Sequence, residues 1–226
     1  MKEKVSRVED YQVFQMGNPK ADKLLVQMVD DHDLEVIESE ISYIWELSGG
    51  QDFCLKAVKV NNWNNDLSPW EAPAVFGNKA FGGSASETLK YVLEKVVPSS
   101  EDKRSQGLKR IFIGGYSLAG LFALWTGYQT DCFDGVAAAS PSIWFPDFTE
   151  YMQKNKLLTD AVYLSLGDRE KNTRNPVMAK VGDAICKAQR LIEDSGIECI
   201  LEWNKGNHFK GHDLRTAKAF SWLLKH

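Results

Sequence analysis

Residues 108–125, LKRIFIGGYSLAGLFALW, constrain the fold more than any other part of the chain. A short apolar run, Ile111–Ile113, leads into two glycines, and an apolar helical run begins directly after Ser117. This order predicts a strand, a sharp turn and a helix, with the serine hydroxyl presented at the turn. Helix and strand approach closely there, so the residues two before and two after the serine must be small. Gly115 and Ala119 occupy those places.

The same stretch has a simpler interpretation. A serine that caps an ordinary helix after a strand would look similar, and a lone G-x-S-x-A pattern does not distinguish the two. If Ser117 is a nucleophile, the amide of Leu118 opens the helix and points at a developing oxyanion. The residues that follow the other predicted strands distinguish these interpretations.

Length and composition predict one globular domain spanning residues 1–226. The chain has 226 residues, 43% hydrophobic and 26% charged, which is enough for a sizeable core. A net charge of −4 without a dominant basic patch argues against a nucleic-acid partner. No apolar run approaches the roughly 20 residues of a membrane helix. We therefore expect a small-molecule partner, with no nucleic acid and no membrane; the oligomeric state is left open.

The N-terminus and the cysteines bear on location and cofactors. The first residues, MKEKVSRVEDYQVF, contain charge but no apolar signal region, which predicts a cytoplasmic protein. Cys54, Cys132, Cys186 and Cys199 are scattered, without the spacing of a metal site. We expect them to be reduced core residues, and we expect neither a cofactor nor a metal.

Short apolar runs alternate with helical patterns along the chain. This alternation predicts a mostly parallel sheet covered by helices on both faces, with function at the carboxyl ends of the strands. The expected strands are 23–29, 53–60, 110–114, 135–139, 161–166 and 197–203, and the expected helices are 34–47, 86–97, 118–129, 177–195 and 213–224.

Three of these strands are followed by residues that suit nucleophilic catalysis. Ser117 follows one, the acidic run Gly167–Glu170 follows another, and His208 lies shortly after the last. A serine hydroxyl is a poor nucleophile until a base takes its proton, and a carboxylate must hold that base in one tautomer. The order serine, acid, histidine is the chain order of an α/β-hydrolase triad.

Both partners of the serine have rivals. We favour His208 as the base because Gly206 lets its loop turn tightly after the strand, whereas His212 is expected at the start of the last helix. A metal pair formed by the two histidines lacks further ligands. We favour Glu170 over Asp168 as the acid because it is further from the strand and reaches further.

A second oxyanion amide is expected after the first predicted strand, at Asp31 or His32. The acidic residues of this loop, Asp30, Asp31 and Asp33, fit a helix N-terminal cap. They could instead bias the site towards cationic or neutral substrates.

Aromatic residues supply candidate walls for a substrate. Trp63 and Trp70 lie in a loop that is too long and too aromatic for a plain connection, and Trp144 lies in a second loop with Ser142. We expect the three tryptophans to bind substrate and Ser142 to provide a polar contact. Packing against a neighbouring helix is the alternative for these rings.

At these residues the chain resembles the serine esterases of the α/β-hydrolase superfamily, in the branch of enterochelin-type esterases, esterase D and the mycolyltransferases. The resemblance rests on GGYSLAGLFALW, ASPSIWF at 139–145, LSLGDREK at 164–171 and GNHF at 206–209. It implies an α/β-hydrolase fold with a mostly parallel central sheet, helices on both faces and no large cap domain. In that branch the acid often lies three residues after the glycine that ends its strand, which is Glu170 here. Some relatives have a long N-terminal extension for specificity, and we expect none in this protein.

Two functions are consistent with these features. The first is a serine hydrolase that cleaves carboxylic esters through Ser117, His208 and Glu170 and an acyl-enzyme intermediate, or transfers the acyl group to another alcohol. The second is a non-catalytic binding or scaffold protein on the same fold.

Overall fold

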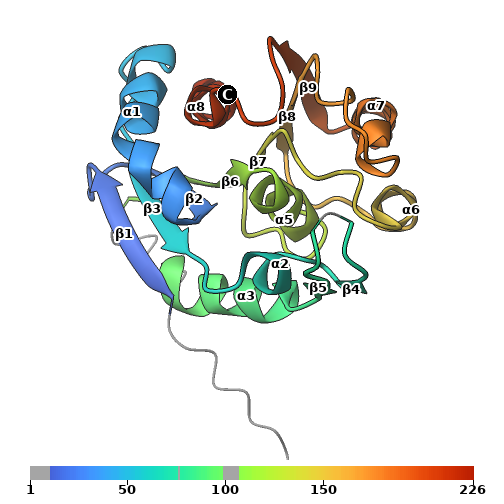
Figure 1. The fold of residues 1–226 in the computed structure, drawn as a ribbon. Helices are drawn as coiled ribbons and strands as arrows, with labels where there is room; N and C mark the ends of the chain where they lie inside the picture. The colour runs from blue at the N-terminus through green and yellow to red at the C-terminus, as the bar shows by residue number, and fades with distance from the viewer. Residues whose placement is uncertain (1–10, 76, 99–106) are drawn as a thin grey trace, which may run out of the picture.

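A seven-stranded sheet forms the centre of the computed structural model, which describes residues 11–75, 77–98 and 107–226 (Figure 1). The outermost strand β1 runs antiparallel to its neighbour β3, and every other neighbouring pair is parallel. In spatial order the strands are β1 (Gln12–Gly17), β3 (Cys54–Lys59), β2 (Lys23–Val29), β6 (Arg110–Tyr116), β7 (Gly135–Ala139), β8 (Ala161–Gly167) and β9 (Glu198–Asn204).

Helices cover both faces of the sheet. Two of them, α1 (Asp31–Leu47) and α8 (His212–Lys225), pack together on one face, as Figure 1 shows. The other face is covered by α3 (Ala85–Tyr91), which continues as the π-helical turn η1 (Val92–Val96), and by α5 (Leu118–Thr126), α6 (Phe148–Lys154) and α7 (Val181–Asp194), the last preceded by the 3₁₀ turn η2 (Met178–Lys180). The sheet thus separates two apolar clusters, one beneath each helical layer.

Central strands are apolar along their whole length because both of their faces are buried. In β2, KLLVQMV, every residue after Lys23 is buried, including the polar Gln27. This is the pattern of a parallel strand between two helical layers. The strand 23–29 and the strand 135–139 have the predicted bounds, and the other four differ by one or two residues at an end.

Gly114 lets α8 approach the sheet closely. A Cβ placed on it would lie 2.6 Å from Cζ of Phe220 and 2.7 Å from Cβ of Ala137. Neither neighbour has room to move, because both are fully buried. The first glycine of the pair that precedes Ser117 therefore allows α8 to pack on this face.

The register of the strands brings their carboxyl ends to one edge. Tyr116 pairs with Ala139, and Gly167 pairs with Asn204. The chain therefore leaves β6, β7, β8 and β9 on the same side of the sheet. This edge is where chemistry was expected from the sequence.

Several elements were not predicted. The sequence patterns missed β1 and α6, and the long aromatic loop contains α2 (Trp63–Asp66) and a small hairpin of β4 (Glu71–Ala72) and β5 (Phe81–Gly82). The expected helix 86–97 is α-helical only to Tyr91, and the expected helix 177–195 begins as a 3₁₀ turn.

Of the four cysteines only Cys54 is buried. Cys132, Cys186 and Cys199 are half-buried, so the expectation that all four are core residues was wrong for these three. They pack at the edge of an apolar cluster and not within it. Among the described helices none is long and apolar enough to cross a bilayer. Residues 1–10, on which most of the expectation of a cytoplasmic location rests, lie outside the described part of the chain.

Candidate active site

Ser117 lies at a strained turn between β6 and α5. Its backbone has φ 60° and ψ −120°, a combination that non-glycine residues rarely adopt and that costs about 1–3 kcal/mol. The Ser117 amide donates to the Ala139 carbonyl at 3.1 Å, which anchors the turn to the neighbouring strand β7. The turn therefore holds the serine at the end of the strand with its hydroxyl free to meet other loops.

The small residues around Ser117 are required by close contacts. A Cβ on Gly115 would lie 2.6 Å from Cβ of Ala119. A Cβ on Gly120 would lie 2.9 Å from the Gly115 carbonyl oxygen and 3.1 Å from that of Ala139. Both glycines allow α5 to start directly against the sheet, and this explains why the glycine after Ala119 is also needed.

A chain of two hydrogen bonds joins the predicted serine, histidine and acid. Nε2 of His208 lies 2.9 Å from Oγ of Ser117, and Nδ1 of His208 lies 2.7 Å from Oε2 of Glu170. The three residues come from the ends of β6, β9 and β8 respectively. The structure thus places the histidine between the serine and the acid; their roles in catalysis are a prediction.

The Glu170 carboxylate is almost completely buried, with 4% of the side chain exposed. Burial alone would raise its pKa. The hydrogen bond and charge of His208, with hydrogen bonds from the Gly167 amide and the Ser140 hydroxyl, outweigh burial and hold the pKa of Glu170 below its usual value. Glu170 is therefore ionised and can accept a hydrogen bond from Nδ1 of His208.

The loop that carries His208 is fixed by the backbone and by Asp168. Gly206 has φ 117°, and its amide donates to Oδ1 of Asp168 at 2.8 Å. The Tyr116 hydroxyl donates to the His208 carbonyl at 2.7 Å. Asp168, the rival for the acid, thus binds the loop backbone, whereas Glu170 contacts the imidazole.

His212, the rival for the base, lies elsewhere in the site. Its ring packs against that of His32 with centroids 4.7 Å apart, and its buried Nε2 has no hydrogen-bond partner among the residues that the structure describes. Burial and the neighbouring His32 lower the pKa of His212. Within the described ranges no three or more His, Cys, Asp or Glu side chains are grouped to hold a metal ion.

A cavity of about 190 Å³ opens beside Ser117. Part of its lining comes from the start of α1, so the amino ends of α1 and α5 both reach it. The amides in a first helical turn have no partner within the helix, and those of Leu118 and Asp31 are such amides. The cavity is lined by Asp30, His32, Asp33, Trp63, Tyr116, Ser117, His208, Phe209 and His212.

The acidic residues at the start of α1 form the expected helix cap. Oδ1 of Asp30 accepts from the Asp33 amide at 2.9 Å, and Oδ2 of Asp33 accepts from the Asp30 amide at 3.1 Å. Asp31 points outward and pairs with Lys59. Burial and the nearby charge of Asp30 raise the pKa of Asp33 to about 7. The cap interpretation is confirmed.

Trp63 is the one predicted substrate-binding tryptophan among the residues that line this cavity. Trp144 is instead close to Phe81, with ring centroids 6.3 Å apart. Ser142, predicted as a polar contact, has Oγ 3.3 Å from Oγ of Ser117, and its amide donates to the Ser117 carbonyl at 3.0 Å. The second loop therefore contacts the serine through Ser142.

Trp70 packs away from this cavity. Its ring lies against Phe145, Phe148 and Tyr151, at centroid distances of 5.6, 6.3 and 5.4 Å, and its indole N–H donates to the Pro146 carbonyl at 3.2 Å. These contacts join the aromatic loop to α6. The packing alternative describes the position of Trp70 better than a substrate wall does.

Sequence patterns missed two residues that complete the site. Arg215, on α8, is buried with 3% of its side chain exposed and lies 2.8 Å from Oε1 of Glu170. Ser140 lies in the turn after β7, and its hydroxyl donates to the same oxygen at 2.8 Å. A single arginine inside a helical pattern carries no signal of such a role, but the position of Ser140 at a strand end was a signal that could have been used.

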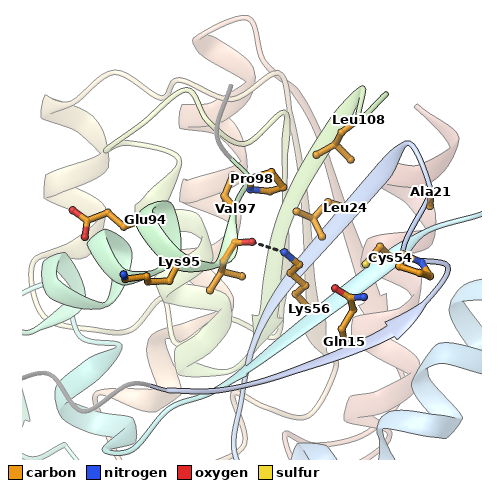
Figure 2. A pocket seen from close by; sticks show the side chains of 12 residues that line it. Gln15, Ala21, Leu24, Cys54, Lys56, Glu94, Lys95, Val97, Pro98 and Leu108 are labelled. Atoms are coloured by element: carbon orange, nitrogen blue, oxygen red, sulfur yellow. Dashed lines mark hydrogen bonds between the residues drawn. The ribbon is translucent and has the colours of Figure 1, made fainter. Parts of the chain in front are cut away.

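A larger cavity of about 490 Å³ lies at the opposite edge of the sheet, near the amino ends of β2 and β3 (Figure 2). Lys56 donates to the Val96 carbonyl across it at 2.7 Å. Its lining residues Pro98 and Leu108 flank segment 99–106, which lies outside the described residues. We assign no site to this cavity.

Comparison with known proteins identifies the fold. No model of a protein family matches the chain, and no curated protein matches its sequence. Among solved structures it is similar to an IroE-like serine hydrolase from Shewanella oneidensis, with a TM-score of 0.73 and 14% identity over 96% of this chain and 80% of the other. It is also similar to the siderophore hydrolase EstA from Aspergillus nidulans, with a TM-score of 0.68 and 17% identity over 99% and 97%.

The enterobactin esterase FES from Shigella flexneri is similar as well, with a TM-score of 0.61 and 13% identity over 95% of this chain and 54% of that one. The branch that the sequence resembles thus reappears among its structural neighbours. At these identities the likeness concerns the fold. The chain has the α/β-hydrolase fold expected from its sequence, a mostly parallel sheet with helices on both faces.

Proposed function

We propose that the protein is a serine esterase that cleaves carboxylic esters of small molecules through an acyl-enzyme intermediate. The observation that carries the proposal is the hydrogen-bonded chain from Ser117 through His208 to the buried Glu170. Its position at the carboxyl edge of an α/β-hydrolase sheet, beside two helix amino ends, supports it further. The names of the structural neighbours, serine hydrolase, siderophore hydrolase and enterobactin esterase, agree with this class of reaction.

In the proposed reaction the Ser117 hydroxyl attacks the ester carbonyl while Nε2 of His208 takes its proton. Glu170 accepts the hydrogen bond from Nδ1 of His208 and stabilises the imidazolium that forms. The Leu118 amide and an amide at the start of α1, for which we favour Asp31, bind the oxyanion. His208 then gives the proton to the leaving alcohol, and a water activated in the same way releases the acid.

The surroundings of Ser117 suit a small neutral ester group. The cavity of about 190 Å³ holds an acyl or alcohol portion of modest size, with the Trp63 ring on its wall. Transfer of the acyl group to an alcohol other than water would use the same residues. We propose no cofactor, metal, nucleic-acid or membrane partner for this chemistry.

A fluorophosphonate probe tests the proposal directly, because it forms a covalent adduct only with an activated serine. We expect labelling of the wild type, loss of labelling in Ser117→Ala, and an adduct on Ser117 and not on Ser142 when the labelled peptide is sequenced by mass spectrometry. Ser142→Ala, which lacks the hydroxyl 3.3 Å away, is the matched control and should still be labelled.

A panel of p-nitrophenyl esters of rising chain length then measures turnover and the size of the acyl site. Hydrolysis that disappears in Ser117→Ala is the expected result. A well-folded wild type that neither reacts with the probe nor hydrolyses any ester would contradict the proposal and favour a binding protein on the same fold.

A further inference from the structure

The two oxygens of the Glu170 carboxylate have different partners. Oε1 accepts hydrogen bonds from the Gly167 amide at 2.7 Å, the Ser140 hydroxyl at 2.8 Å and Nη1 of Arg215 at 2.8 Å. Oε2 lies 2.7 Å from Nδ1 of His208. Oε1 is therefore held by three donors, and Oε2 faces the imidazole. The carboxylate cannot rotate without breaking the three hydrogen bonds to Oε1.

Arg215 contacts Glu170 and the residues that precede Ser117 and His208. Besides Glu170, its Nη1 lies 3.0 Å from the hydroxyl of Tyr116, the residue before Ser117. Its Nη2 donates to the carbonyl of Asn207, the residue before His208, at 3.0 Å. A guanidinium has a rigid planar fork with five donors, so it can hold these groups at fixed angles, whereas an ammonium cannot.

The counter-charge available to Glu170 depends on whether His208 is neutral or protonated. Glu170 and Arg215 are both buried, with 4% and 3% of their side chains exposed. While His208 is neutral, Glu170 would be a buried charge without a counter-ion if Arg215 were absent, and such a charge is costly. Arg215 is charged at every relevant pH and supplies the counter-charge that His208 lacks in that state.

We propose that Arg215 is a positioning residue that keeps the Glu170 carboxylate ionised and correctly oriented while His208 is neutral. This inference rests on the proposed esterase function and deepens it. Arg215 acts through Glu170, without touching the substrate. The acid of the site is therefore a carboxylate–guanidinium pair between the loop after β8 and helix α8, and not a lone glutamate.

Other titratable groups face the same site and have to be separated from this effect. His212 of α8 lines the cavity beside Ser117, and the Tyr116 hydroxyl of β6 contacts Arg215 directly. Across the cavity, α1 contributes Asp30, His32 and Asp33. Because burial raises the pKa of Asp33 to about 7, its own titration falls near the pH of interest. Each variant below is therefore compared a second time in an Asp33→Asn background.

The first experiment measures kcat and KM of Arg215→Met and Arg215→Lys across the acidic limb of the pH–rate profile, with a p-nitrophenyl ester as the substrate. Without the guanidinium, the deprotonated pair of His208 and Glu170 is a buried net charge. The acidic limb of Arg215→Met should thus move to higher pH by about one unit. Its kcat at neutral pH should fall on the order of 100-fold with little change in KM.

Arg215→Lys keeps the charge but not the fork, so it should restore the position of the limb while recovering only part of kcat. A merely structural role predicts a different pattern. Loosening of the loops would lower kcat equally at every pH and leave the limb in place, and this result would overturn the proposal.

A double-mutant cycle covers the case in which Arg215→Met does not fold. Glu170→Gln combined with Arg215→Met removes both members of the buried pair, which is often tolerated better than removal of one. If Arg215 acts through Glu170, the double variant should be about as active as Glu170→Gln alone. Losses that multiply would overturn the proposal.

Lys218→Met is the matched control, because Lys218 lies one turn further along α8 and pairs with Glu202, outside the site. Its pH profile should match that of the wild type. If the wild type shows no turnover and no probe labelling, the esterase proposal fails, and the role of Arg215 is then read by NMR titration of the His208 imidazole. A midpoint that is higher in Arg215→Met supports the inference without any turnover, and an unchanged midpoint overturns it.

Discussion

Nδ1 of His208 lies 2.7 Å from Oε2 of Glu170, although Asp168 is closer to the strand end from which both carboxylates emerge. The loop after β8 contains two carboxylates within three residues, and each has a different partner. Asp168 accepts the Gly206 amide at 2.8 Å and so fixes the histidine loop, while Glu170 reaches the imidazole itself. Glu170, which has the longer side chain and lies two residues further along the loop, is thus the carboxylate that contacts the imidazole.

Glu170→Gln should reduce ester turnover far more than Asp168→Asn. A glutamine keeps the shape but cannot stabilise the imidazolium, and the corresponding change in serine-protease triads lowers kcat by about 10⁴-fold. In Asp168→Asn the side-chain carbonyl would still accept the Gly206 amide, so this change should cost at most about 1 kcal/mol of stability. Steady-state kinetics and urea unfolding of the two variants test this. A larger loss of kcat in Asp168→Asn would mean that the acid is Asp168.

His208→Ala should abolish turnover while the protein still unfolds cooperatively. His208 is half-buried and supports no core packing, so its loss removes the proposed base and little else. His212→Gln should retain most of the activity, because His212 packs on His32, whereas the ring that meets Ser117 is that of His208. Rates measured with a p-nitrophenyl ester distinguish the two. Activity that survives in His208→Ala and disappears in His212→Gln would assign the base to His212.

Most of the sheet was predictable because its strands are buried on both faces and are therefore continuously apolar. The strand 135–139, GVAAA, is an example in which every residue is buried. Strand β1 was missed because it lies at the edge of the sheet. Its residues are largely exposed, including Val13 and Phe14, so it lacks the apolar run of a central strand. Helix α6 is short, and only Phe148 and Met152 are buried in it.

The convergence of the candidate catalytic residues at one edge of the sheet was predictable for a related reason. Ser117, Glu170 and His208 each follow a strand, and the register of a parallel sheet brings those ends to one edge. Arg215 was not predictable, because it reaches the site from within a helix, and only packing reveals which face of α8 is turned to the sheet. The same holds for Trp70, whose partners are set by where α6 lies.

Trp63→Ala and Trp70→Ala should differ in which property they change. Trp63 lines the cavity beside Ser117, so Trp63→Ala should raise KM for longer or aromatic acyl esters with little loss of stability. Trp70 is packed among three aromatic rings and bonds to the Pro146 carbonyl. Trp70→Ala should destabilise the fold by about 3 kcal/mol or more and leave KM nearly unchanged.

Kinetics with short and long p-nitrophenyl esters, together with thermal unfolding of both variants, check this pair. Trp63 is only partly buried, which makes its replacement the milder change for the fold. Equal KM values for the wild type and Trp63→Ala across the ester panel would make that ring structural.

Asp33 should make the protein less stable as the pH rises from about 4 to about 7. Burial, with the charge of Asp30, raises the pKa of Asp33 from 3.8 to about 7 in the folded state. Between these values the folded protein binds more protons than the unfolded chain, so the free energy of unfolding falls with increasing pH, and the penalty is fully present above about pH 7. At about 1.4 kcal/mol per unit of pKa, the shift corresponds to a few kcal/mol.

Asp33→Asn should remove this dependence, because an amide can still accept the Asp30 amide in the helix cap but does not ionise. Urea unfolding at acidic and mildly alkaline pH should show a variant that gains stability relative to the wild type only at the higher pH. Asp31→Asn is the control, since Asp31 lies on the same turn with 81% of its side chain exposed. The buried Glu40, whose pKa is also raised by burial and by Asp33, adds a dependence of the same sign, and the part of it that burial causes remains in the variant. If Asp33→Asn and the wild type lost equal stability between the two pH values, the Asp33 carboxyl would titrate as an exposed group and its burial beside the cavity would be contradicted.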